Sequence, residues 1–296
     1  MGNILTKQFY RQRKDFEDSC AGRDSVLTFP EGVRCSTDIA YADDGIKAHM
    51  LDIYRPEDSQ EKILPVIINV HGGGLIIGNK EFNRYFCALL CKKGFLVYSI
   101  EYRLIPDCLI YDQIADVFMA MDYIKERLAA DGGDSSHVYM AGDSGGACLI
   151  TYANAIQNST NIARAANVTP SGLRINALGL ISGMFYTSRF DKIGLFLPKY
   201  LYGRDYKKTS FAKYVNPENR ELLNSLAPVW LVTSHNDFLR RYTTDFEKAL
   251  TRAEREHELV VFPKNKKLTH AFSVFEPFLP ESSAVIDMMV EYLRKF

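Results

Sequence analysis

The chain has 296 residues, of which 47% are apolar and 24% charged, with 36 basic and 36 acidic side chains. This composition is typical of a globular protein with a substantial core. A net charge of zero without a basic stripe argues against nucleic acid as a partner, because phosphate binding needs a cationic surface. No apolar run reaches the length of a transmembrane helix, and the first residues are too polar for a secretory signal. We therefore expect no stable membrane insertion.

The cysteines indicate free thiols and no metal centre. They form no Cys-x-x-Cys pair, which favours the thiols of a reducing compartment, and we expect a cytoplasmic protein. Cys87 and Cys91 are four residues apart in a helix-like segment, but no pair of histidines lies near them in the sequence. A metal site is therefore not expected. The six cysteines are at positions 20, 35, 87, 91, 108 and 148.

Residues 1–35 are rich in charge, with apolar residues scattered among them. This pattern predicts one or two amphipathic helices that lie over the rest of the molecule. The first six residues, Met1-Gly2-Asn3-Ile4-Leu5-Thr6, match a short N-myristoylation pattern and are followed by basic residues. The alternative interpretation is a solvated N-terminal helix.

The next segments predict a sheet. Ser36–Tyr41 and Ile46–Tyr54 are typical of two strands joined by a hairpin turn at Asp43-Asp44-Gly45. Leu64–Val70 is a near-continuous apolar run, as expected of a strand buried on both faces. Beyond it, strand-like and helix-like segments alternate. In chain order these are helix 82–92, strand 95–100, helix 111–130, strand 138–141, helix 147–157, strand 175–181, strand 229–234, helix 241–255, strand 259–262 and helix 285–294.

The alternation predicts an α/β fold with a mostly parallel central sheet of about eight strands, covered by helices on both faces. The opening hairpin would form its antiparallel edge. One segment does not fit: about 45 residues separate the strands at 175–181 and 229–234, which is too long for a simple connection. This segment is dense in aromatic residues, at 185, 186, 190, 196, 200, 202, 206, 211 and 214.

The aromatic segment predicts a helical lid. Its aromatics either line a substrate pocket or pack the lid onto the body, and the sequence does not separate these possibilities. We find no internal repeat and no low-complexity tract. We therefore expect residues 1–296 to form a single domain, with 1–35 as an N-terminal cap segment and 183–227 as the lid insertion.

Gly142-Asp143-Ser144-Gly145-Gly146 lies between a predicted strand and a predicted helix. A strand that turns into a helix within three residues forces the serine at its apex into a strained conformation, which lifts the hydroxyl out of the sheet edge. The alternative is a glycine-rich turn that happens to contain serine. A serine hydroxyl is a poor nucleophile unless a general base and a partner for that base are present.

Both groups follow predicted strands, at the edge where open α/β sheets keep their sites. Asp237 comes after strand 229–234, although it could also be the N-cap of the next helix. His270 comes after strand 259–262. The chain order Ser144, Asp237, His270 is that of α/β-hydrolases. We expect the remaining histidines, at positions 49, 137, 235 and 257, to be structural or solvated.

His71-Gly72-Gly73-Gly74 follows the buried strand directly. Its glycines let backbone amides approach a ligand closely, and together with the serine turn it is typical of an oxyanion hole. The glycine spacing does not match a dinucleotide-binding loop. We expect His71 to hold this loop by hydrogen bonds.

At these residues the sequence resembles the hormone-sensitive-lipase-like branch of the α/β-hydrolases. The matching motifs are His71-Gly72-Gly73-Gly74 with Gly78, Tyr102-Arg103-Leu104-Ile105-Pro106, Gly142-Asp143-Ser144-Gly145-Gly146, Asp237 with Leu239-Arg240, and His270. The resemblance implies hydrolysis of carboxyl esters without a cofactor, oxyanion donors at the amides of Gly73, Gly74 and Gly145, and a cap built in part from the N-terminal segment. Tyr102, Arg103 and Asp116 are expected to brace the site and not to act on the substrate.

The chain departs from the family pattern at four positions. Gly145 and Phe238 stand where alanine and proline are usual, Arg241 replaces an acidic residue, and Ala271 replaces glycine. None of these changes removes a catalytic group, but Phe238 and Arg241 put the details of the acyl pocket in doubt.

The sequence therefore predicts a serine carboxylesterase for short-chain acyl esters, with a small-molecule ester as its partner and a homodimer as a possible assembly. Alternatives with the same triad are a carbohydrate (acetyl) esterase or an arylformamidase. A non-catalytic binding protein of the hydrolase fold is a further alternative. A peptidase ranks last, because no propeller-like repeats precede the motifs.

Overall fold

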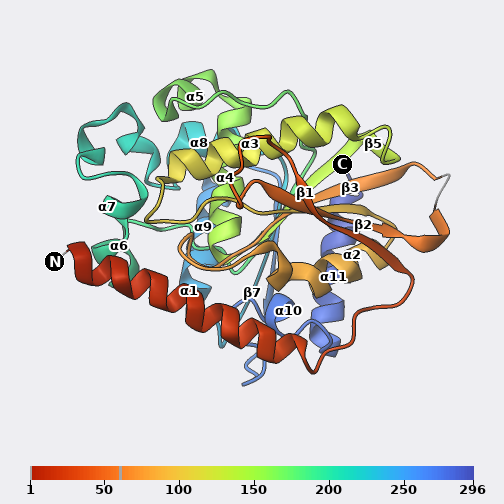
Figure 1. The fold of residues 1–296 in the computed structure, drawn as a ribbon. Helices are drawn as coiled ribbons and strands as arrows, with labels where there is room; N and C mark the ends of the chain where they lie inside the picture. Colours follow the sequence, from red (N-terminus) through yellow and green to blue (C-terminus); the bar gives the residue numbers. More distant parts are fainter. Residues whose placement is uncertain (1, 60–61) are drawn as a thin grey trace.

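The computed structural model of the chain describes residues 2–59 and 62–296. Within these residues, eight strands form one sheet in the order β1-β2-β4-β3-β5-β6-β7-β8 (Figure 1). The strands are β1 (Val33–Ala40), β2 (Met50–Pro56), β3 (Leu64–Val70), β4 (Leu96–Ile100), β5 (Gly133–Asp143), β6 (Leu178–Ile181), β7 (Val229–Ser234) and β8 (His257–Phe262). β2 is antiparallel to both of its neighbours, and the remaining pairs are parallel. This confirms the predicted α/β-hydrolase type of sheet.

Helices cover both faces of the sheet. They are α1 (Gly2–Asp24), α2 (Arg84–Lys92), α3 (Ile110–Arg127), α4 (Ser144–Asn158), α5 (Thr160–Ala166), α6 (Lys192–Phe196), α7 (Pro198–Leu201), α8 (Arg220–Asn224), α9 (Arg240–Arg252), α10 (Phe272–Phe275) and α11 (Pro280–Leu293). Side chains alternate along β3, so that Val66 and Ile68 join the core under α3, α4 and α9, whereas Ile67 joins the core under α2, α10 and α11. The apolar run of β3 is thus explained by burial on both faces.

The predicted opening hairpin was wrong in its second strand, because β2 begins at Met50 and not at Ile46. Residues 41–49 form an irregular connection in place of a tight turn. The carboxylate of Asp44 accepts the backbone amide of Ile46 at 2.9 Å and contacts Nδ1 of His49 at 2.6 Å. These local bonds compete with strand pairing, as short polar side chains commonly do. His49 is consequently buried in the loop and is not part of an edge strand.

The N-terminal segment contains a single long helix, α1, which crosses the edge where the parallel strands end. Its residue Phe9 belongs to one core cluster and Cys20 to the other. In Figure 1, α1 (red) passes α6 and α7 near its start and reaches α10 near its end. Met1 of the acylation pattern lies outside the described residues, and Gly2 is the first residue of α1. That pattern stays a prediction. None of the helices in residues 2–59 and 62–296 is both long enough and apolar enough to cross a membrane.

The aromatic segment folds as short helical pieces: α6, α7, the 3-10 turns η3 (Tyr206–Lys208) and η4 (Ser210–Tyr214), and α8. Two other 3-10 turns, η1 (Glu57–Ser59) and η2 (Lys80–Asn83), lie in loops of the sheet. Phe211 is fully buried, and its ring packs 5.6 Å from Tyr152 of α4 and 5.2 Å from Tyr111 of α3. Phe190 and Phe196, by contrast, are exposed. Several of the aromatics therefore attach this segment to the body.

Candidate active site

Ser144 sits on a turn that only small neighbours allow. Its backbone is left-handed, with φ of +49°, which is strained for serine. A Cβ atom on Gly146 would lie 2.1 Å from the carbonyl oxygen of Val70, and one on Gly142 would lie 2.9 Å from the carbonyl carbon of Gly146. The end of β5, the start of α4 and the end of β3 are therefore in backbone contact. This contact places the serine hydroxyl at the carboxyl edge of the sheet, at the N-terminus of a helix of 15 residues.

The structure brings Ser144, His270 and Asp237 together from the ends of three strands. Nε2 of His270 lies 2.8 Å from Oγ of Ser144, and Nδ1 lies 2.8 Å from Oδ1 of Asp237. Asp237 also accepts the amide of Leu239 at 2.8 Å and the hydroxyl of Thr233 at 2.9 Å. The N-cap of α9 is Leu239, so the alternative N-cap role of Asp237 is not found. This arrangement can transfer a proton from the serine to the imidazole.

Electrostatics fix which nitrogen of His270 carries the proton. Burial raises the pKa of Asp237, but the hydrogen bond and charge of His270 and the amide of Leu239 outweigh it, so the pKa is lowered overall. An ionised Asp237 accepts a hydrogen bond from Nδ1 of His270, which directs Nε2 toward Ser144. His270 is largely buried, with 13% of its side chain exposed.

The glycine loop after β3 lies against the start of α4. A Cβ atom on Gly145 would lie 3.0 Å from the amide nitrogen of Gly74 and 2.9 Å from that of Leu75. Alanine, which the family pattern favours here, would therefore push the loop away, and glycine allows a closer approach. Gly73 and Gly74 have φ values of +103° and +62°, which glycine adopts without strain. Among the described residues, the amides of Gly73 and Gly74 donate to no protein acceptor.

Asp143, the residue before the serine, ties the glycine loop to the sheet. Its Oδ1 accepts the amide of Gly72 at 3.0 Å and Nδ2 of Asn83 at 2.9 Å. Burial raises the pKa of Asp143 above its usual range. Ser182, after β6, accepts the amide of Ala271 at 3.1 Å and also bonds to Asp237. The sequence motifs assigned no role to Asp143, Asn83 or Ser182. Asp143 lies within the serine turn, where its carboxylate was an available signal, whereas Asn83 and Ser182 lie outside the motifs and nothing in the sequence marks them.

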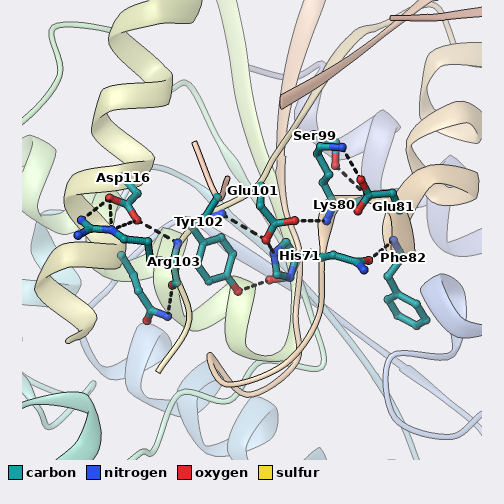
Figure 2. Close-up of polar contacts among 12 residues, drawn as sticks. His71, Lys80, Glu81, Phe82, Ser99, Glu101, Tyr102, Arg103 and Asp116 are labelled. Carbon is teal, nitrogen blue, oxygen red and sulfur yellow. Dashed lines mark hydrogen bonds and ion pairs between the residues drawn. The ribbon is translucent and has the colours of Figure 1, made fainter. Parts of the chain in front are cut away.

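His71 holds the glycine loop from behind, as expected (Figure 2). Its Nε2 contacts Oε1 of Glu101 at 2.9 Å, and its Nδ1 contacts the carbonyl of Gly72 at 2.8 Å. Its ring stacks on Tyr102 at 4.4 Å, and the Tyr102 hydroxyl donates to the carbonyl of His71 at 2.8 Å. Both ring nitrogens face acceptors, and the imidazolium satisfies both. Burial lowers the pKa of His71, but the charge and hydrogen bond of Glu101 outweigh it and raise the pKa overall.

The neighbouring polar residues are structural. Arg103 donates to both carboxylate oxygens of Asp116, which is fully buried, and neither side chain belongs to the serine cluster (Figure 2). The other histidines bond elsewhere: His49 to Asp44, His137 to Asp134, His235 to Arg240 and His257 to Arg255. In residues 2–59 and 62–296, no three His, Cys, Asp or Glu side chains gather to hold a metal ion, and the cysteines are free thiols.

The departures from the family pattern have local explanations. Ala271 has φ of +48°, a conformation that favours glycine, and the hydrogen bond that its backbone amide donates to Oγ of Ser182 holds it there. Phe238 is 74% exposed, and its ring lies 4.5 Å from that of His270. Phe238 therefore presents an apolar surface beside His270. Arg241 is exposed on α9 and contacts none of these groups.

Fold and site together place the chain in the α/β-hydrolase fold class, and comparison with known proteins agrees. A profile of the alpha/beta hydrolase fold matches residues 67–273, which is more than half of the chain. The chain belongs to this family, and the resemblance noted from the motifs is confirmed. Its likeness to a solved structure, that of esterase B from Lactobacillus rhamnosis, covers 100% of this chain and 96% of the other, with a TM-score of 0.92 and 22% identity.

Curated relatives match a smaller part. A probable isoprenylcysteine alpha-carbonyl methylesterase of Oryza sativa subsp. japonica is 29% identical over 184 residues, which are 58% of this chain and 44% of the relative. The esterase LipQ of Mycobacterium tuberculosis is 32% identical over 120 residues, which are 40% of this chain and 28% of the relative. The chain spans less than half the length of the first curated relatives that it matches.

Proposed function

We propose that this protein is a serine carboxylesterase that hydrolyses short-chain acyl esters through Ser144, His270 and Asp237. The observation that carries the proposal is the continuous path of two 2.8 Å contacts from Ser144 through His270 to Asp237. It lies next to amide groups that have no protein acceptor among the described residues. A nucleophile, an oriented base and unpaired donors are what acyl transfer requires.

In the proposed mechanism, Ser144 attacks the ester carbonyl while His270 takes its proton. Asp237 stabilises the imidazolium that forms, and the amides of Gly73, Gly74 and Gly145 donate to the oxyanion of the tetrahedral intermediate. His270 then gives its proton to the leaving alcohol, and an acyl-enzyme remains on Ser144. Water, activated by His270, attacks the acyl-enzyme and releases the acid.

The names of the relatives support a carboxyl ester as the substrate. One is a methylesterase and another an esterase, and a structure similar over the whole chain bears the description of inhibition by a tributyrin phosphonate. Exposed apolar surface at Phe238, beside His270, suits an apolar ester. The whole chain is proposed to act as a single cytoplasmic domain, capped by residues 1–35 and 183–227, without nucleic acid as a partner and with a homodimer as its candidate assembly.

The test is hydrolysis of p-nitrophenyl acetate, butyrate, octanoate and laurate, together with acetylated xylo-oligosaccharides, by the wild type and by Ser144→Ala. We expect turnover of the short acyl esters that falls about 10⁶-fold in Ser144→Ala, since the serine forms the covalent intermediate. A clear preference for the acetylated sugars would move the activity to carbohydrate deacetylation. A folded wild type that hydrolyses none of these esters would contradict the proposal and favour a binding role.

A further inference from the structure

The turn that carries the proposed oxyanion donors is tied to α1 by one side chain. The carbonyl of Gly73 accepts the amides of Ile76 at 3.1 Å and Ile77 at 3.0 Å, which folds residues 73–77 into a compact turn. The carbonyl of Ile76 in turn accepts Nε of Arg13 at 2.8 Å. Arg13 lies on α1, and only 18% of its side chain is exposed.

The same guanidinium closes a ring of hydrogen bonds. Nη2 of Arg13 donates to the carbonyl of Ile105 at 2.6 Å, and the amide of Ile105 donates to the carbonyl of Leu75 at 3.0 Å. Because Leu75 and Ile76 are neighbours, the ring runs from Arg13 through the turn to the segment after β4 and back. The N–H groups of a guanidinium are fixed in a planar fork. One side chain therefore sets the spacing between two carbonyls.

The ring holds a strained residue in place. Leu75 is fully buried and has φ of +68°, a left-handed conformation that costs a leucine free energy. Such a residue persists only where its surroundings fix it. The carbonyl of Leu75 accepts Ile105 within the ring and also Nε2 of Gln113 at 3.0 Å. Leu75 directly follows Gly74, and the two residues share the peptide group between them. The backbone conformation of Leu75 therefore fixes how that peptide group is oriented.

We propose that Arg13 is a positioning residue for the oxyanion hole, and that through this one side chain α1 supports the proposed donors as well as covering them. The inference rests on the proposed esterase function. Amides stabilise an oxyanion only when they are aimed at the place where the charge develops. A displacement of about 1 Å can lower the rate about 100-fold. Arg13 acts through the turn and touches no reacting atom.

The ion pair between Arg13 and Asp107 does not account for the proposed positioning of the turn. Its Nη1 lies 2.7 Å from Oδ2 of Asp107, which also accepts the hydroxyl of Tyr10. The side chain of Asp107 is 47% exposed, however, and exposed ion pairs contribute little to stability. Asp107→Asn leaves the two carbonyl bonds of Arg13 in place. It therefore separates the charge pair from the ring.

The experiment compares kcat and KM for p-nitrophenyl butyrate among Arg13→Ala, Asp107→Asn and Arg11→Ala. Arg11 is the matched control, since it lies on the same helix, is 83% exposed and pairs with the exposed Asp15 at 3.7 Å. We expect Arg13→Ala to lower kcat about 10- to 100-fold with KM little changed. Both other variants should stay within about twofold of the wild type. Millimolar guanidinium chloride, against equal sodium chloride, should restore part of the kcat of Arg13→Ala alone.

Arg13→Lys serves if the alanine variant does not fold. It keeps the charge and the packing of the stem, but one ammonium cannot reproduce the fork, so the loss of kcat should persist. Equal kcat in Arg13→Lys and the wild type would overturn the inference, and so would equal kcat in Arg13→Ala and Arg11→Ala.

Hydrogen exchange tests the ring without catalysis. The amides of Ile76 and Ile77, which donate to the carbonyl of Gly73, should exchange faster in Arg13→Ala than in Arg11→Ala, because the turn loses its bond to Arg13 and the ring through Ile105 opens. Equal exchange would overturn the positioning role, whatever the kinetics. An inactive wild type whose exchange nevertheless responds to Arg13→Ala would contradict the esterase proposal and leave the ring supported.

Discussion

The serine turn and the N-terminal helix meet at the same glycine loop, but they hold it in different ways. At the turn, backbone packs on backbone: a Cβ on Gly146 would lie 2.1 Å from the carbonyl oxygen of Val70. At α1, side chains reach across from a separate element, as Arg13 does to the carbonyls of Ile76 and Ile105. The first kind of contact depends on glycines that lie within the motifs themselves. The second depends on a side chain that lies more than 60 positions before the turn that it holds.

The largest expected difference between the serine turn and the α1 contacts is the effect on kcat of replacing a carboxylate in each. Asp237 is buried and accepts His270, whereas Asp107 is half exposed and accepts Arg13. We expect Asp237→Asn to lower kcat about 10⁴-fold, since an amide neither holds the required tautomer nor stabilises the imidazolium. Asp107→Asn should leave kcat almost unchanged. Steady-state kinetics of both variants on one ester would check this, and similar losses in the two would erase the distinction.

Much of the proposed catalytic site could be predicted from the sequence. The serine turn, the glycine loop and the acid and base each follow a strand, and parallel strands bring their carboxyl ends to one edge. The structure places Ser144, Asp237 and His270 there in contact. The chain order of these three residues, together with the glycines beside the serine and in the loop after β3, is therefore enough to predict where the site lies.

The contacts of α1 with the glycine loop could not be predicted in the same way. Arg13 lies in a charged helix whose sequence gives no sign that one of its several basic residues is largely buried. Its partners are backbone carbonyls, which every residue possesses, so no side-chain pattern marks them. Ser182 and Asn83 escaped notice because their bonds depend on how distant loops pack. The predicted hairpin turn within residues 41–49 was wrong because the side chain of Asp44 forms a local hydrogen bond with the amide of Ile46.

A smaller expected difference concerns protein stability when a glycine of the serine turn or a glycine of α1 is replaced by alanine. Gly146→Ala would force backbone oxygens of Val70 and His71 to move, since a Cβ there lies 2.1 and 2.5 Å from them. We expect it to lower the free energy of unfolding by about 3 kcal/mol. Gly22→Ala on α1 meets nothing within 4 Å and should raise that free energy by up to about 1 kcal/mol, as alanine favours helix. Urea unfolding of both variants would decide. A Gly146→Ala protein as stable as the wild type would show that the backbone contact is not tight.

The smallest effect is a dependence of stability on pH at the back of the glycine loop. His71 is buried, and Glu101 raises its pKa in the folded state above the value of about 6.5 expected when unfolded. The folded state therefore binds a proton more tightly than the unfolded state. The resulting stabilisation is complete below about pH 6.5 and is lost as the pH rises through the folded pKa.

Glu101→Gln isolates this contribution, because it removes the charge that raises the pKa of His71 and keeps an oxygen acceptor for Nε2. The free energy of unfolding should fall less in Glu101→Gln than in the wild type as the pH rises from about 6.5 to about 9. Urea titrations at several pH values measure this difference. Parallel curves would show that Glu101 does not hold a proton on His71. In that case Tyr102, which stacks on the imidazole and donates to its backbone carbonyl, would hold the loop without help from charge.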